Sequence, residues 1–212
     1  LPGLESFNGE IFHSSRWNHD LDLTGKRVAV IGTGASAIQF IPEIQPKVKQ
    51  LVAFQRTPQW ILPKPDIKIN KRVKGLFHFP FTLNLFRKSL YLGMETFGLG
   101  FRKPAILKRL QGLAKWHINR HIKDEELKKK ITPDYTMGCK RVLLSNHYYK
   151  ALAQDNVGVI ASGVDKIEGN SIIASNGEQC EADVIILGTG FHVSDMPIAK
   201  QVQGKSGKTL DE

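Results

Sequence analysis

The stretch KRVAVIGTGASA, residues 26–37, decides the fold of this chain. Its first six residues form a short apolar, β-branched run that predicts a buried strand. A glycine-rich turn follows, and then the helical pattern ASAIQFIPEI, in which we expect Pro42 to kink or end the helix. QLVAF, residues 50–54, predicts a second buried strand. Strand, turn, helix and strand within about 30 residues make a βαβ unit, so we predict an α/β fold with a parallel sheet.

The turn matches the pattern G-x-G-x-x-A, and each fixed position has a mechanical reason. Gly32 permits a tight turn out of the strand, Gly34 lets backbone approach a pyrophosphate, and Ala37 keeps the helix close to the strand. The helix N-terminus offers free N–H groups and partial positive charge to phosphates. A purely structural glycine turn is the alternative. The predicted cofactor-binding residues of this turn and helix are Gly32, Thr33, Gly34, Ala35, Ser36, Ala37 and Gln39.

The residues after the second strand distinguish NADP from NAD. An acidic residue there would hydrogen-bond the ribose 2′-hydroxyl, but the chain has Gln55-Arg56-Thr57. Arg56 can form a charge-assisted fork with a 2′-phosphate, and Thr57 can donate its hydroxyl. We therefore predict NADP(H) rather than NAD(H), with Arg56 as an ordinary surface arginine as the alternative.

The rest of the chain divides by pattern. Residues 1–24 show no sustained period and predict a connecting segment. Apolar residues recur at helical spacing between residues 60 and 150, which predicts a helical insertion with short helices near 124–130 and 142–153. β patterning returns over 157–187, with a hairpin or meander at Asn176-Gly177. We therefore expect a Rossmann-like dinucleotide-binding domain over 25–187 and a further segment over 188–212.

Composition bounds the function classes. Of 212 residues, 41% are hydrophobic and 24% charged, which excludes a disordered or fibrous chain. No apolar run approaches the length of a membrane span. Residues 61–150 carry 20 basic and 6 acidic side chains, a balance that attracts nucleic acid, acidic lipid or a phosphorylated cofactor. Two cysteines make no disulfide framework, so we expect a cytoplasmic protein.

A second motif precedes the glycine turn. Phe7, Gly9, His13 and Trp17 match F-x-G-x-x-x-H-x-x-x-W. With this motif the chain resembles the Baeyer–Villiger monooxygenases and their flavin-monooxygenase relatives. Residues 55–58, 138–141 and 183–191 resemble the same family, whereas Asn18 and Gly188 depart from its usual residues.

The resemblance implies an enzyme with two dinucleotide-binding domains, one for FAD and one for NADPH. This chain resembles the second domain with its connections, because it lacks the FAD-type G-x-G-x-x-G turn. We therefore expect a piece of a longer protein that holds NADP(H) but does not itself hold FAD. Its last part, with Gly188, Thr189, Gly190 and Phe191, resembles the return of the chain to the FAD domain.

The resemblance also implies an activity. The full protein would insert one oxygen atom from O2 into a ketone, giving an ester or lactone, or would oxygenate the sulfur or nitrogen of a sulfide or amine. The cofactor performs this chemistry, and the protein positions it. A non-catalytic nucleotide-binding fragment, inactive without the FAD domain, is the alternative.

Individual residues take roles from the same resemblance. Arg141 matches the catalytic arginine that the family places over the flavin, where a permanent positive charge stabilises developing negative charge. Lys140 would reach the NADP 2′-phosphate beside Arg56 and Thr57. A solvated basic pair is the alternative for Lys140 and Arg141. His13 and Trp17 would orient the NADP domain as it moves, with simple packing of a loop as the alternative.

Other sites are weaker candidates. His117 and His121 lie four residues apart, but no Glu or Cys supports a metal site, so we predict none. We expect Cys139 to be a buried structural cysteine. The basic, Phe-containing insertion favours a cap over a substrate tunnel rather than membrane association. No helix-turn-helix, RNP or zinc pattern is present, so we predict no nucleic-acid partner.

Overall fold

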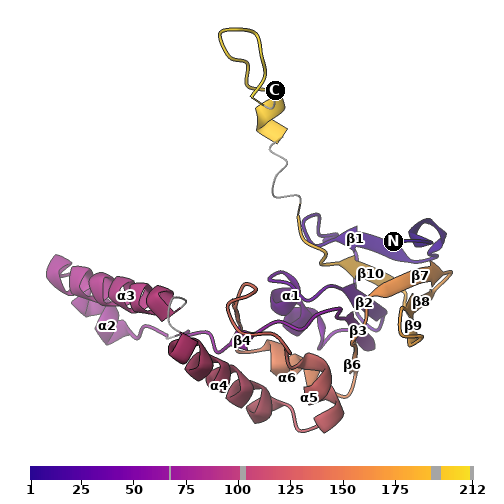
Figure 1. Ribbon diagram of the computed structural model, residues 1–212, viewed down its shortest axis with the longest axis horizontal. Helices are drawn as coiled ribbons and strands as arrows, with labels where there is room; N and C mark the ends of the chain where they lie inside the picture. The colour runs from indigo at the N-terminus through magenta and orange to yellow at the C-terminus, as the bar shows by residue number, and fades with distance from the viewer. Residues whose placement is uncertain (67, 101–103, 192–196, 211–212) are drawn as a thin grey trace.

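The computed structural model describes residues 1–66, 68–100, 104–191 and 197–210, and its centre is a parallel sheet of five strands. The strand order is β1 (Glu10–His13), β10 (Val184–Leu187), β2 (Arg27–Ile31), β3 (Gln50–Phe54) and β6 (Val157–Ile160). Every neighbouring pair is parallel, with Val30 opposite Ile186 on one side and Ala53 on the other. The predicted α/β fold with a parallel sheet is confirmed (Figure 1).

Both faces of this sheet are covered, which explains why its inner strands β10, β2 and β3 are mostly apolar. Successive residues of β2 point to opposite faces. Val28 and Val30 pack into a core on the helical side, whereas Ala29 and Ile31 pack into a second core on the other side. The glycine turn therefore leaves the sheet between two packed layers.

Helices cover one face. They include α1 (Ala37–Ile44), α5 (Glu125–Ile131) and α6 (Tyr148–Leu152). Pro42 lies inside α1, which ends two residues later. The Asp124 carboxylate accepts a hydrogen bond from the backbone N–H of Glu126 at 2.9 Å and caps α5.

An antiparallel sheet covers the other face. Its strands are β7 (Val164–Glu168), β8 (Ser171–Ala174) and β9 (Gln179–Glu181), in that order. Gly177 has a φ of 85° between β8 and β9, so the predicted Asn-Gly hairpin is confirmed. Ile167, Ile172 and Ala174 of this small sheet pack into the second core.

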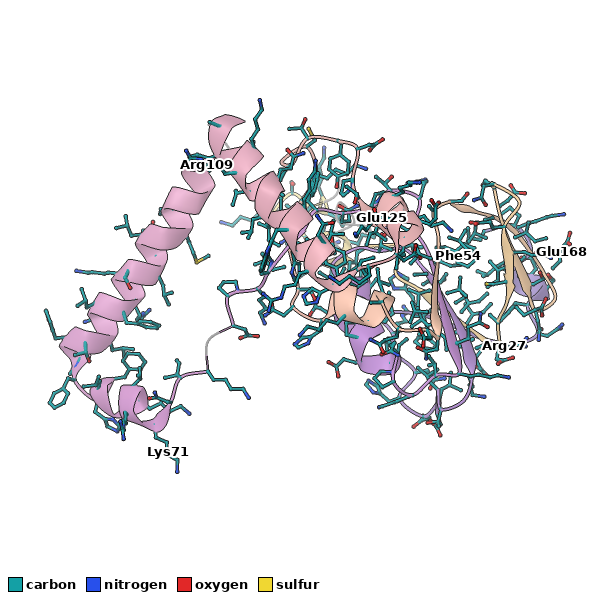
Figure 2. All side chains as sticks on the ribbon, turned by 90° about the horizontal axis from the view of Figure 1, so that it is seen from below. Arg27, Phe54, Lys71, Arg109, Glu125 and Glu168 are labelled. Atoms are coloured by element: carbon teal, nitrogen blue, oxygen red, sulfur yellow. The ribbon has the colours of Figure 1, made fainter. Side chains whose placement is uncertain are left out.

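The insertion after β3 contains β4 (Ile61–Leu62), α2 (Lys71–Leu76), α3 (Pro80–Gly100), α4 (Pro104–His121) and, beyond α5, β5 (Leu143–Leu144). β4 and β5 pair in parallel. Ala114 of α4 packs against Trp60, Leu62 and Met137. In Figures 1 and 2, α2 and α3 stand away from the sheet. Large apolar side chains of α3 such as Phe81 and Leu85 are exposed.

The structure differs from expectation in two elements. The segment expected to be a connection, residues 1–24, contains a short helix, Leu4–Ser6, and the edge strand β1. The single helix expected over 142–153 is the strand β5 followed by the short helix α6. Leu143 donates its backbone N–H to Trp60 O at 2.9 Å, so this part of the chain joins a sheet instead. The Ser145 hydroxyl then accepts from the N–H of Tyr148 and delays the helix start.

Helices of the part of the chain that the structure describes are either too short or too polar to cross a bilayer. A 3₁₀ helix, Pro197–Lys200, lies in the C-terminal segment, which extends away from the sheet in Figure 1.

Candidate functional site

The glycine turn is held between two neighbouring strands. Gly32 donates its N–H to Phe54 O at 3.1 Å, and Gly188 donates to Ile31 O at 2.8 Å. Gly32 has a φ of 106°, and a Cβ added there would collide with the carbonyl oxygen of Gly188. Only glycine fits this position without strain.

Gly34 is required for a different reason. A Cβ added there would meet no atom within 4 Å, so the space above Gly34 is open. Ala37 is fully buried under the turn, and Gly188 lies against it. The turn thus has close packing behind it and room in front of it, as a backbone cradle for a pyrophosphate requires.

A pocket of about 550 Å³ opens in front of the turn. Its lining includes Gly32, Thr33 and Gly34 of the turn, Arg56 and Thr57 after β3, Lys140, and Gly188 to Gly190 after β10. Except for Lys140, which comes from the insertion, these residues follow the carboxyl ends of the adjacent parallel strands β2, β3 and β10, where α/β sheets bind ligands. The volume lies within the range of pockets for small molecules and cofactors.

Tyr135 positions Lys140 at this pocket by contacting both Lys140 and the segment that follows β3. The Lys140 ammonium lies 4.9 Å from the centre of the Tyr135 ring. The Tyr135 hydroxyl donates to Pro58 O at 3.1 Å, and Trp60 donates its indole N–H to Tyr135 O at 2.9 Å. Burial raises the pKa of Tyr135, so its hydroxyl stays neutral and remains a donor. These contacts fix the end of the insertion beside the segment that follows β3.

The pocket is electropositive. Arg56 and Lys140 are exposed, and neither has a carboxylate within ion-pair distance among the residues with described positions. None of the described lining residues is acidic. The Arg56 side chain lies next to Gly163, because a Cβ added to Gly163 would be in van der Waals contact with Arg56 Cδ at 3.9 Å. Two free cations at the rim favour a ligand that carries phosphate groups.

Some predicted site residues do not line this pocket. Ala35 and Ser36, just before α1, and Gln39 within it are not part of the lining, and the Gln39 amide donates to Ala35 O at 2.7 Å. Arg141 is exposed next to Lys140 but is not part of the lining. Cys139 is also exposed, so the expectation that it is buried is wrong: it lies in the turn that presents Lys140.

The four residues of the N-terminal motif have separate places. Phe7 is buried in the second core. Gly9 lies so close to Asp183 that a Cβ would collide with its carbonyl oxygen. His13, at the end of β1, shares a hydrogen bond between Nδ1 and the Ser15 hydroxyl at 2.7 Å.

His13 and Trp17 contact other aromatic rings. The ring of His13 lies edge-on to Phe191, with 5.7 Å between centres. Trp17 packs 5.0 Å from Phe12 and 5.3 Å from Phe40 of α1. The loop after β1 is therefore fixed to α1 by aromatic packing, which agrees with the packing alternative for Trp17.

The sequence interpretation missed lining residues at the end of β6. Ser162, Gly163 and Val164 complete the pocket wall, and Gln59 adds an amide from the segment after β3. The strand at 157–160 could have indicated these residues, because its carboxyl end lies at the same edge of the sheet as Phe54. Its position beside β3 was not predicted.

Among the side chains that the structure describes, no group of three His, Cys, Asp or Glu residues is arranged to hold a metal ion. The rings of His117 and His121 are 5.1 Å apart. His117 donates the N–H of Nε2 to Ser145 O at 2.9 Å, which occupies one of its two nitrogens.

Comparison with known families identifies the chain. The family described as flavin-binding monooxygenase-like matches residues 1–206. The chain belongs to this family. A Baeyer–Villiger monooxygenase of Pseudomonas aeruginosa is 53% identical over 99% of the chain, and one of Streptomyces coelicolor is 50% identical over all of it. The resemblance inferred from the N-terminal motif is thus confirmed. The chain spans only 40% and 41% of the length of these two relatives.

Solved structures of family members share the fold. A cyclohexanone monooxygenase in an open crystal structure superposes on the whole chain with a TM-score of 0.80 at 23% identity, and the match covers 49% of that protein. OTEMO, crystallised in complex with FAD and NADP, matches 99% of the chain and 47% of its own length with a TM-score of 0.77 at 27% identity.

Proposed function

We propose that this chain is the NADP(H)-binding part of an FAD-dependent monooxygenase. The whole protein would insert one oxygen atom from O2 into a ketone, giving an ester or lactone, or would oxygenate the sulfur or nitrogen of a sulfide or amine. The observation that carries the proposal is the convergence of the glycine turn, Arg56 and Lys140 on one pocket. The names of the relatives support the reaction class, and the FAD and NADP bound to OTEMO support the cofactors.

The residues present fit NADP(H). Open space above Gly34 gives the pyrophosphate room at the N-terminus of α1, and the unpaired cations Arg56 and Lys140 suit a 2′-phosphate. Thr57 adds a hydroxyl at the same rim. When bound, NADP(H) supplies hydride and FAD supplies the oxygen chemistry. The residues of this chain bind and orient the nucleotide.

The domain assignment belongs to the same proposal. Residues 25–187 form the NADP-binding domain, 60–150 its helical insertion, 1–24 the connection that carries the motif, and 188–212 the return toward the FAD domain. Residues 192–196 and 211–212 of that return lie outside the described residues. The contact between His13 and Phe191 joins the two connections and supports a hinge at this edge of the sheet. Of the insertion residues that the structure describes, Lys140 alone lines the pocket, so the role of the insertion as a cap over a substrate tunnel stays a prediction.

Arg56 provides the first test. We expect NADPH to bind the chain at least about tenfold more tightly than NADH, because only NADPH carries a 2′-phosphate. Arg56→Gln should weaken NADPH binding by about one to two orders of magnitude and leave NADH binding unchanged. Titration calorimetry measures both constants. Arg87→Gln, an exposed arginine on α3, is the matched control. Equal affinities for NADPH and NADH in the unsubstituted chain would overturn the assignment.

Arg141 is the candidate catalytic residue, and its exposed side chain next to Lys140 leaves it available to a partner outside this domain. In the whole enzyme, Arg141→Ala should lower the oxygenation rate by a factor of about 10² to 10³, because a fixed charge at the reacting oxygen is lost. The dissociation constant for NADPH should not change. A parallel loss of NADPH affinity would instead assign Arg141 to nucleotide binding.

The second candidate function is nucleotide binding without catalysis. It is favoured by the composition of the pocket lining, because the glycine turn, Arg56 and Lys140 suit a phosphorylated nucleotide. The two candidates differ in one measurement, which is NADPH oxidation by the whole protein in the presence of O2 and a ketone.

A further inference from the structure

A second pocket of about 570 Å³ lies away from the nucleotide turn, between the end of α4 and the start of α6. It shares no lining residue with the pocket at the turn. Six basic residues line it: Lys68, His117, Arg120, His121, His147 and Lys150. This concentration of positive charge has no part in the function proposed above.

Helical spacing brings these side chains together. His117, Arg120 and His121 lie three and four residues apart on α4 and therefore share one face. His147 and Lys150 repeat the same spacing at the start of α6. His117 is 3% exposed and forms the floor, whereas Arg120 and Lys150 are exposed at the rim.

The positive charge is not neutralised within the described part of the chain. Asp66 is the one acidic residue of the lining, and its carboxylate pairs with Lys64 at 3.2 Å. Arg120 contacts the ring of Trp116, 5.3 Å from its centre, and has no carboxylate within ion-pair distance among the described side chains. An anion entering this pocket meets fixed cations without displacing an internal partner.

The imidazoles add a proton-dependent component. Burial, followed by the charge of Arg120 and Lys150, lowers the pKa of His117. Burial, with His117, Lys150, Arg120 and Lys123 nearby, lowers the pKa of His121. Both rings are therefore neutral at neutral pH, and a nearby dianion would stabilise their protonated forms.

We propose that this pocket binds the phosphate group of a soluble phosphomonoester. Arg120 and Lys150 supply charge-assisted hydrogen bonds, and His121 and His147 close the site as further donors. Trp116, which is 50% exposed, contributes an apolar side chain to the lining for the group that carries the phosphate. The volume suits a molecule of that size. This assignment stands on the second pocket alone and does not depend on the proposed nucleotide site.

Histidine resonances of the full chain test the proposal directly. Inorganic phosphate should shift the ring signals of His117, His121 and His147 in a saturating manner and raise the pKa of His117 and His121. The signals of His19 and His78, which lie outside the pocket, should not move. Sulfate is the second probe, because it remains a dianion across the whole titration. The affinity for sulfate should therefore rise as the pH falls and His117 and His121 become protonated. Signals that move linearly without saturation, or that all move together, would overturn the proposal.

Variants separate this pocket from the nucleotide site, which also favours phosphate. Arg120→Gln should weaken phosphate binding, as read by the His121 signal, by about tenfold. Arg87→Gln, on α3, and Arg56→Gln should leave that signal and its saturation unchanged. If the His121 signal of Arg56→Gln no longer responds to phosphate, the second pocket is not a separate phosphate site. The chain should not bind phosphatidylcholine vesicles that contain phosphatidic acid in preference to soluble anions. If it binds these vesicles and its histidine signals do not respond to phosphate or sulfate, the ligand is a lipid surface and the proposal is overturned.

Discussion

At the scale of single residues, Gly32 and Gly34 of the same turn are required for different reasons, Gly32 for folding and Gly34 for ligand access. Gly32→Ala should lower the free energy of unfolding by about 1–3 kcal/mol, because φ is positive and Gly188 blocks the new Cβ. Gly34→Ala should leave stability unchanged, because its Cβ meets no protein atom, but should weaken NADPH binding by about tenfold or more. Urea unfolding and calorimetry measure the two effects. Equal destabilisation by both substitutions would contradict this division.

His117 gives a prediction on pH. Its pKa is lowered in the folded chain from 6.5, so the unfolded chain binds more protons below that value. Stability should therefore be full above about pH 7 and should be lost as the pH falls below 6.5, because the unfolded chain then binds the proton more readily than the folded chain. His117→Gln should flatten this dependence. Urea unfolding in chloride buffers, free of phosphate and sulfate, provides the measurement. An unchanged slope in His117→Gln would show that another group titrates.

At the scale of elements, α3 and α4 differ in what they contribute to stability. Ile118 of α4 is 1% exposed in the main core, so Ile118→Ala should cost about 2–5 kcal/mol. Leu85 of α3 is 58% exposed, so Leu85→Ala should change stability by less than about 0.5 kcal/mol. Thermal or urea unfolding distinguishes the two. A large loss in Leu85→Ala would mean that α3 packs against the molecule in solution.

The elements also show what sequence patterns can and cannot predict. The strands at 27–31, 50–54 and 184–187 were predictable because burial on both faces makes them continuously apolar. The edge strand β1 was missed because only Phe12 of its four residues is buried. The helix expected over 142–153 failed because pairing of Leu143 with Ile61 outweighs local helical spacing.

At the scale of the whole molecule, we expect the purified chain to be colourless. The pocket at the glycine turn offers one nucleotide cradle, and the FAD-type turn is absent from the sequence. The absorption spectrum of the purified chain, before and after incubation with FAD, measures retained flavin. The same sample should bind NADPH, which serves as its control. Stoichiometric flavin in the chain would contradict the assignment of FAD to another domain.

The assembly of the candidate site illustrates a limit of local patterns. The βαβ unit predicted the glycine turn and Arg56 together, because they lie on consecutive strands of one unit. Lys140 reaches the same pocket from the far end of the insertion, through Tyr135 and Trp60. No periodicity of the sequence shows that contact, and only the resemblance to the family placed Lys140 near the nucleotide. Ser162 and Gly163 were missed because strand order, not strand identity, brings them to the pocket.

The close approach of Gly32 and Gly188 has a mechanical consequence. The glycine turn after β2 and the turn after β10 are in backbone contact. We therefore expect residues 32–34 and residues 188–190 to move together. A displacement of the chain just beyond Gly190 should therefore also displace the peptide groups of the glycine turn at residues 32–34.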